Sequence, residues 1–337
     1  MKTVLVPGLL LLLLSACQIL YPPGVYNDLN RGSPGGGLPG SGQNPGSIQG
    51  SDWTPATTAA AFSPRYGMAV LTNNGNMWVI GGFDGVNYLS DVWLSPDGIN
   101  WSEASASASF SGRRYHSSIL FHGFIWIICG WNASTYLGDI WSSPNGTNGW
   151  IQASPIGTPP TPRYCQAAAA FNNSLWVLGG DNGSGALNDV YYSPDGSTWA
   201  QVNTGTYFTA RYGHTCVVFN GSLWVIGGCG AALYNDIWYS ATGTNWTEAV
   251  ANAPFPARYM HTSVVYDNKI WVMGGKSGAS RLNDIWSSPD GTNWTQATPS
   301  SLFSKRDSLS SIEFNNEMWI LAGWDGTSIF NDVFFSQ

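Results

Sequence analysis

The chain has 337 residues, of which 10% are charged and 14% are aromatic, with 18 Trp and 41 Gly. Disordered chains have few aromatic side chains and many charges, so this composition excludes disorder for most of the length. The net charge of −7, without any run of Lys or Arg, argues against nucleic-acid binding. Many Trp and Gly residues together are typical of short strands joined by tight turns.

The N-terminus has the pattern of an export signal. Lys2 precedes an apolar run, residues 4–14, that is too short to span a bilayer. The run ends in Leu14-Ser15-Ala16-Cys17, which resembles the lipobox of bacterial lipoproteins. This resemblance implies cleavage before Cys17 and lipidation of its thiol, so residues 1–16 are expected to be a signal peptide. The alternative is an ordinary secretory peptide with an incidental cysteine.

The expected anchor also sets the location and the layout of the chain. Gln18 after the lipidated cysteine implies an outer-membrane address in the bacterial cell envelope. Residues 17–51 are expected to be the lipidated cysteine and a flexible tether, because they are rich in Gly, Pro and Ser. Residues 52–337 form the folded domain. We expect membrane contact through the lipid anchor only.

The folded domain repeats itself six times. The copies begin at Arg65, Arg113, Arg163, Arg211, Arg258 and Arg306, with spacings of 48, 50, 48, 47 and 48 residues. Thirteen residues after each Arg stands a Trp, namely Trp78, Trp126, Trp176, Trp224, Trp271 and Trp319. A glycine pair or a variant of it follows, and then an Asp that occurs in every copy: Asp91, Asp139, Asp189, Asp236, Asp284 and Asp332.

This pattern resembles the kelch repeat, with its Arg-x-x-His, double Gly and late Trp. The resemblance implies an all-β fold, a six-bladed kelch-type β-propeller with one four-stranded blade per repeat. The residues favour the same fold, because β-branched and aromatic segments alternate with turns such as Asn74-Gly75 and Ser95-Pro-Asp-Gly98. The last copy stops before its fourth strand, and Asp52-Trp53-Thr54 matches the missing segment. We therefore expect the N-terminal strand to complete the last blade and remove a free sheet edge.

Residue types present in every copy are expected to build the blades. The repeated Arg and Asp are interpreted as one hydrogen-bonded pair per blade, since buried charges persist when they are paired. His116, His214 and His261 occupy equivalent positions in separate blades, so we expect them to be structural, with no metal site. Free thiols are favoured at Cys129, Cys165, Cys216 and Cys229, although a disulfide between the first two is conceivable.

Asymmetric residues are the candidates for function. Trp131 and Trp324 stand outside the repeated Trp positions, each in the loop that joins the second and third strands of its blade. In kelch propellers the face that carries these loops is the usual ligand-binding one. Further candidates on that face are Phe83, Asp84, Tyr88, Tyr136, Asp181, Tyr234, Lys276, Arg281, Asp325 and Arg114. Blades six, one and two are neighbours, so Trp324, Phe83 and Trp131 are expected to form an aromatic arc; loop packing is the alternative.

No catalytic motif stands out, so no catalytic residue is assigned and no cofactor is expected. The first hypothesis is a non-enzymatic binding or scaffold protein, a monomer that engages a protein or glycan ligand through this face. The alternative is a sugar-active enzyme of the sialic-acid mutarotase or epimerase type. Such an enzyme requires carboxylates at the mouth of the axis, where Asp84, Asp181 and Asp325 are candidates by location.

Overall fold

The computed structural model describes residues 50, 52–202, 205, 207–298 and 300–336, and every regular element in them is a β-strand. The expected signal peptide, Cys17 and nearly all of the expected tether lie outside these residues. Among the described residues no helix is long and apolar enough to cross a membrane.

Each repeat supplies the same strands in the same order, except that the fourth strand of the last repeat comes from before repeat one. The first strands are β2 (Ala69–Asn73), β6 (Ser117–Phe121), β11 (Ala167–Phe171), β16 (Thr215–Phe219), β20 (Thr262–Tyr266) and β24 (Ser310–Phe314). The second strands are β3 (Asn76–Phe83), β7 (Phe124–Trp131), β12 (Ser174–Asp181), β17 (Ser222–Gly230), β21 (Lys269–Ser277) and β25 (Glu317–Trp324). The third strands are β4 (Tyr88–Ser95), β8 (Tyr136–Ser143), β13 (Ala186–Ser193), β18 (Leu233–Ser240), β22 (Ser280–Ser288) and β26 (Ile329–Ser336).

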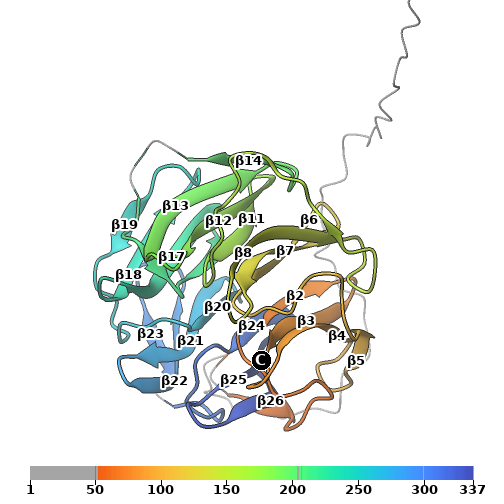
Figure 1. Cartoon of the computed structure of the whole chain (residues 1–337). Helices are drawn as coiled ribbons and strands as arrows, with labels where there is room; N and C mark the ends of the chain where they lie inside the picture. The colour runs from red at the N-terminus through yellow and green to blue at the C-terminus, as the bar shows by residue number, and fades with distance from the viewer. Residues whose placement is uncertain (1–49, 51, 203–204, 206, 299, 337) are drawn as a thin grey trace, which may run out of the picture. The chain divides into compact units, whose positions relative to one another are not determined.

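The fourth strands are shorter and lie toward the outside in Figure 1. They are β5 (Ser102–Ser105), β9 (Ile151–Gln152), β14 (Thr198–Gln201), β19 (Thr247–Val250), β23 (Thr295–Thr298) and β1 (Thr54–Thr57). Two further short strands, β10 (Ile156–Gly157) and β15 (Arg211–Tyr212), lie between repeats. The second strands are buried along nearly their whole length, whereas the fourth strands expose their first half in most repeats.

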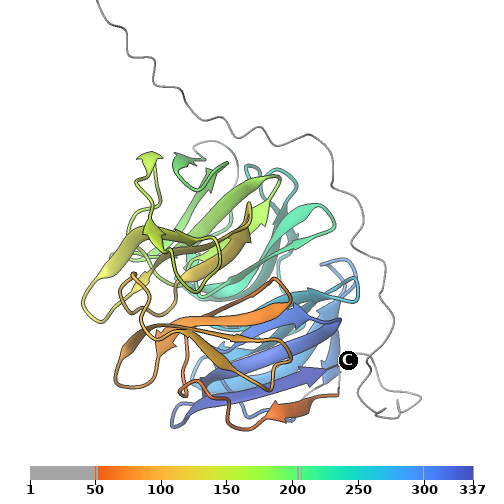
Figure 2. The ribbon, with the colours of Figure 1, turned by 90° about the vertical axis from the view of Figure 1, so that its right-hand side faces the viewer.

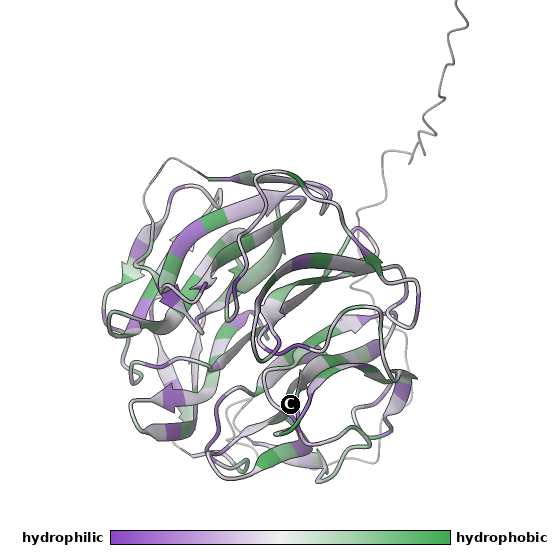
Figure 3. Ribbon diagram, viewed as in Figure 1, coloured by the Kyte–Doolittle hydropathy of each residue, from purple (hydrophilic) through white to green (hydrophobic). Residues whose placement is uncertain are grey.

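The core lies between neighbouring repeats, which explains the second-strand tryptophans. Trp78 of repeat one packs with Ile125 and Ile127 of repeat two. The same ring also covers Gly146, where an added Cβ would lie 2.7 Å from the indole. Sheets covered on both faces need bulky apolar side chains, and hydrophobic segments recur along the strands in Figure 3. The high aromatic content therefore builds the interfaces between repeats.

The sheets differ in one respect from six separate blades. Four repeats form separate four-stranded sheets, but repeats three and four share a ten-stranded sheet. The link is β15, whose Arg211 pairs with Leu187 of β13 and with Gly230 of β17. In repeat four the repeat Asp follows its Arg by 25 residues instead of 26, so the shortened loop brings Gly230 opposite Arg211. The other repeats make only an isolated bridge at this place.

The N-terminal strand belongs to the last repeat, as the sequence predicts. β1 pairs antiparallel with β26, with Thr54 opposite Phe335. Figure 2 shows this orange strand beside the blue C-terminal strands. Gly50 also packs on Trp271, as Gly98 packs on Trp319. The last sheet is thus built from both ends of the chain, and it already includes Gly50, two residues before the boundary expected at residue 52.

The first strands surround an axis. β2, β6, β11, β16, β20 and β24 contact one another in this order, and β24 contacts β2. One residue of each repeat, the second after the repeat Arg, donates its backbone N–H to the carbonyl of its counterpart in the preceding repeat. These six hydrogen bonds form a closed cycle, which we call the axial ring, through Gly67, Tyr115, Cys165, Gly213, Met260 and Ser308. The fold is therefore an all-β propeller closed around its axis.

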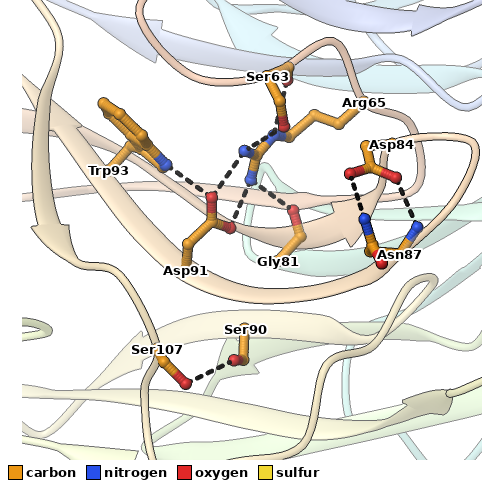
Figure 4. A network of polar contacts seen from close by, with 9 residues as sticks. All are labelled: Ser63, Arg65, Gly81, Asp84, Asn87, Ser90, Asp91, Trp93 and Ser107. Atoms are coloured by element: carbon orange, nitrogen blue, oxygen red, sulfur yellow. Dashed lines mark hydrogen bonds and ion pairs between the residues drawn. The ribbon is translucent and has the colours of Figure 1, made fainter.

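The repeated Arg and Asp form the expected pair in every repeat. In repeat one Arg65 donates to both carboxylate oxygens of Asp91 at 2.7 Å and to the carbonyl of Gly81 at 3.0 Å (Figure 4). The indole N–H of Trp93 donates to the same carboxylate. Equivalent ion pairs occur in the other repeats at 2.5–2.7 Å, and the arginine side chains are buried. These residues stabilise the blades.

Candidate ligand-binding site at the mouth of the axis

The loops between second and third strands lie beside the residues that directly follow each repeat Arg. Backbone bridges join these two segments in five repeats: Tyr66 to Phe83, Arg114 to Trp131, Tyr164 to Asp181, Tyr259 to Lys276 and Asp307 to Trp324. In repeat four Tyr212 pairs with Cys229 in the same way. The loops and the entrances to the first strands therefore share one face, around the mouth of the axis.

Eight aromatic side chains form a continuous path on this face, which we call the aromatic collar. Successive ring centroids lie 4.7–6.4 Å apart in the order Trp324, Tyr66, Phe83, Tyr88, Trp131, Tyr164, Tyr212 and Tyr259. Tyr136 packs on Tyr164 from outside. Apart from buried Tyr66, the collar side chains are partly exposed. The structure thus joins the three residues of the expected arc through Tyr66 and Tyr88.

Arg114 lies inside this path. Its guanidinium carbon is 4.6–5.5 Å from the centroids of five rings, those of Tyr66, Phe83, Tyr88, Tyr115 and Trp131. A terminal nitrogen donates to the hydroxyl of Tyr66, and the Nε has no hydrogen-bond partner. Cation–π contacts of this kind hold the rings in place around the charge. Arg114 therefore organises the collar between repeats one and two.

Charged residues occupy the part of the mouth that the collar leaves open. The Arg281 guanidinium lies 4.2 Å above the centroid of Trp324, and its Nε is 2.6 Å from the carboxylate of Asp307. The Lys276 ammonium is 6.0 Å from the centroid of Tyr259. This segment, from repeats five and six, presents two cations and one carboxylate beside the aromatic path.

The three loop carboxylates stabilise their own loops. Asp84 accepts backbone hydrogen bonds from Val86 and Asn87, Asp325 accepts them from Thr327 and Ser328, and Asp181 accepts one from Gly183. Burial alone would raise the pKa of Asp84, but these N–H donors outweigh burial and lower it; the pKa of Asp325 is lowered for the same reason. An acid–base enzyme would need the opposite shift in at least one carboxyl group.

Comparison with known families agrees with this geometry. The model of the KLHDC2/KLHL20/DRC7 Kelch-repeats domain matches residues 48–180, 144–245 and 166–336. The chain belongs to the kelch-repeat family. A comparison with curated proteins gives no match. The kelch-repeat model therefore covers the folded part of the chain.

The kelch propeller brings together most of the candidate residues. Phe83, Tyr88, Arg114 and Trp131 form one cluster, and Trp324 with Arg281 lies next to it through Tyr66. Tyr234 does not join the collar path, because its ring packs on the buried Arg211, 4.5 Å from the guanidinium carbon.

Four tyrosines of the collar were not among the sequence candidates. Tyr66, Tyr164, Tyr212 and Tyr259 each directly follow a repeat Arg, a position at which the sequence analysis singled out only Arg114. At the same position repeat two has Arg114 and repeat six has Asp307. These two departures from Tyr are the sequence signal that marks the position, and its tyrosines with it, as candidates.

Below the collar, the axial ring and the residues after it line a cavity of about 140 Å³. His116, His214 and His261 are among the lining residues, and all three are buried. Burial lowers the pKa of His116 to about 3, helped by the charge of Arg113, and it lowers the pKa of His214 to about 3 as well. In the described part of the chain no group of three His, Cys, Asp or Glu side chains could hold a metal ion. The four cysteines beyond Cys17 are free thiols.

Proposed function

We propose that this protein is a non-enzymatic binding module that engages a protein ligand through the aromatic collar. The observation that carries the proposal is the continuous path of eight rings at the axis mouth, seven of them partly exposed. Tyr and Trp are enriched where proteins bind tightly, because their flat rings bury a large area at a low cost in side-chain entropy. Arg114 holds the rings of Phe83, Tyr88 and Trp131 in place before any ligand arrives, which lowers the cost of binding.

A glycan is the second candidate ligand. Tyr164 and Tyr212 are partly exposed and lie nearly parallel, with an interplanar angle of 25°. Flat, parallel aromatic faces suit stacking against the apolar faces of sugar rings. The sugar-active enzyme is less well supported, because the pKa values of Asp84 and Asp325 are lowered and all three loop carboxylates are hydrogen-bonded within their own loops.

The test compares ligand capture by three proteins. Wild type, Trp131→Ala/Trp324→Ala and Phe124→Ala are used in a pull-down from envelope extract and on a glycan array. Phe124 is 41% exposed and begins β7 at the opposite end from the collar, so it is the matched control. We expect the double variant to lose its ligand and the Phe124 variant to keep it. Equal capture by the double variant and wild type would contradict the proposal.

The proposed setting is the bacterial outer membrane, with the protein anchored by a lipid on Cys17. The proposal is supported by the lipobox-like tetrapeptide at residues 14–17. We expect Cys17→Ser to remain uncleaved or to be released from the membrane fraction. Mass spectrometry of the mature wild-type N-terminus tests whether Cys17 carries the lipid. An unmodified Cys17 in membrane-bound protein would contradict the anchor.

We also propose that the propeller has six blades and that the protein is a monomer. Support comes from the axial ring, which takes one residue from each of six repeats, and from the equal four-strand order in repeats three and four. Sedimentation equilibrium at the mass of one chain is the expected result for the oligomeric state.

A further inference from the structure

Among the residues that the structure describes, Arg114 is the one arginine without a carboxylate partner. The other seven arginines form ion pairs at 2.5–2.7 Å, the six repeat arginines with the repeat aspartates and Arg281 with Asp307. Arg114 donates from one terminal nitrogen to the hydroxyl of Tyr66. Its Nε is buried without a hydrogen-bond partner, and its other terminal nitrogen donates to no described residue. Because partly buried charges are usually paired, this guanidinium has unused capacity to bind an anion.

The five rings around Arg114 prepare its charge for such a partner. Their centroids lie 4.6–5.5 Å from the guanidinium carbon, so they fix the position of the cation and limit the access of water to it. The rings stabilise the charge without neutralising it. An ion pair is stronger in surroundings that are less polar than water. Arg114 remains partly exposed, so a group of a ligand that lies on the collar can reach it.

The carboxylates of the same face are already engaged elsewhere. Asp84, Asp181 and Asp325 accept backbone hydrogen bonds within their own loops, and Asp307 pairs with Arg281. These four negative charges repel further negative charge on this face. A run of acidic residues is therefore disfavoured at the mouth of the axis, whereas a single carboxylate placed at Arg114 is attracted.

We propose that the protein ligand places one Asp or Glu side chain, flanked by apolar or aromatic residues, against Arg114. This inference rests on the proposed function, because the collar supplies the surface on which the flanking residues pack. The ligand carboxylate accepts a hydrogen bond from the free terminal nitrogen of Arg114. The flanking side chains contact the rings of Phe83, Tyr88 and Trp131. Arg114 thus determines specificity, since a charge pair at an interface discriminates between partners.

The test is an array of N-acetylated, C-terminally amidated heptapeptides in matched pairs that differ only by Glu or Gln at the central position. The blocked ends leave the central side chain as the carboxylate that distinguishes the two members of a pair. The full-length wild type is compared with Arg114→Met, which removes the charge, and with Arg114→Lys, which keeps it. Thermal unfolding of each variant checks that it is folded.

Two further variants separate the possible causes of a change. Lys269→Met removes a cation that begins β21, 3.4 Å from Asp267, and is the matched control for the loss of one charge. Trp131→Ala/Trp324→Ala tests the collar itself. The readout is the ratio of binding to the Glu and Gln members of each pair. Damage to the collar lowers binding to both members equally, whereas loss of a charge pair lowers binding to the Glu member alone.

We expect wild type and Lys269→Met to bind Glu members about tenfold more tightly than their Gln counterparts. The ratio should fall to about one in Arg114→Met and be partly restored in Arg114→Lys. The double collar variant should lose both members.

Equal binding of Glu and Gln members by wild type, or an unchanged ratio in a folded Arg114→Met protein, would overturn this inference. Binding of wild type only to peptides with several acidic residues would overturn it as well. In each case the proposed function would still stand if the double collar variant loses the peptides that wild type binds.

Discussion

At the residue scale, the same position in different repeats carries different chemistry. The third residue after the repeat Arg is His in repeats two, four and five, but Gln166 in repeat three and Leu309 in repeat six. Gln166 donates its amide to the carbonyl of Ile128 at 2.9 Å and needs no proton for it. The histidines pack against the glycine pair of the preceding repeat, as His116 does against Gly81. They fill space between blades, as the sequence predicts.

The buried histidines predict that the stability of the fold depends on pH. The pKa of His116 is about 3 in the fold, against about 6.5 in an unfolded chain, so below pH 6.5 the unfolded state binds a proton that the native state excludes. The free energy of unfolding should therefore fall as the pH decreases from 6.5 toward 3. His116→Gln should reduce this fall, measured by urea unfolding at pH 7 and pH 5. An equal fall in wild type and variant would show that His116 is not kept neutral.

At the scale of elements, the periodic features could be predicted and the contacts across the axis could not. The Arg–Asp pairs and the closure by β1 follow from one repeat aligned on the next. The five rings around Arg114 come from two neighbouring repeats, and the axial ring joins the backbones of all six repeats, so no single repeat contains either arrangement. The joined sheet of repeats three and four goes with the Arg-to-Asp spacing of repeat four, which is one residue shorter than in the other repeats. This shorter spacing is visible in the sequence, but its effect on strand pairing is not.

The axial ring predicts an unequal effect of two similar substitutions. Gly67 and Gly75 have φ values of +64° and +69°, but only an added Cβ at Gly67 would meet neighbours within 4 Å, the Tyr115 ring at 2.9 Å and the Arg114 Cβ at 3.3 Å. Both alanine variants carry the backbone cost of about 1–2 kcal/mol for a left-handed residue. Overpacking against Tyr115 should lower the free energy of unfolding of Gly67→Ala by roughly 1–3 kcal/mol more than that of Gly75→Ala. Denaturant unfolding measures the difference, and equal losses would mean that Tyr115 moves aside freely.

The N-terminal closure predicts where truncation becomes harmful. Deletion through residue 44 removes none of the described contacts, whereas deletion through residue 57 removes β1, Gly50 and the buried Trp53. Loss of the Trp53 contacts alone should cost about 3–5 kcal/mol. The melting temperature should be unchanged in the shorter deletion and clearly lower in the longer one. Equal melting temperatures would contradict closure by β1.

At the scale of the whole molecule, the six repeats build a rigid frame and one face carries the asymmetry. The faces differ because hairpins such as Asn74-Gly75 are nearly uniform, while the loops after the second strands vary in length and charge. Comparison of the repeats in sequence points to this face, because Trp131 and Trp324 stand outside the repeated Trp positions. It did not identify Tyr66, Tyr164, Tyr212 and Tyr259, because their ring contacts arise only when the repeats are arranged around the axis.

The most direct measurement is oxidative footprinting of tyrosines with and without the ligand captured in the pull-down or on the array. We expect protection of Tyr164, Tyr212 and Tyr259 in the collar. Tyr239, which stacks on Trp224 near the opposite end of repeat four, should be labelled equally in both states. Protection of Tyr239 with an unprotected collar would contradict ligand binding at the mouth of the axis.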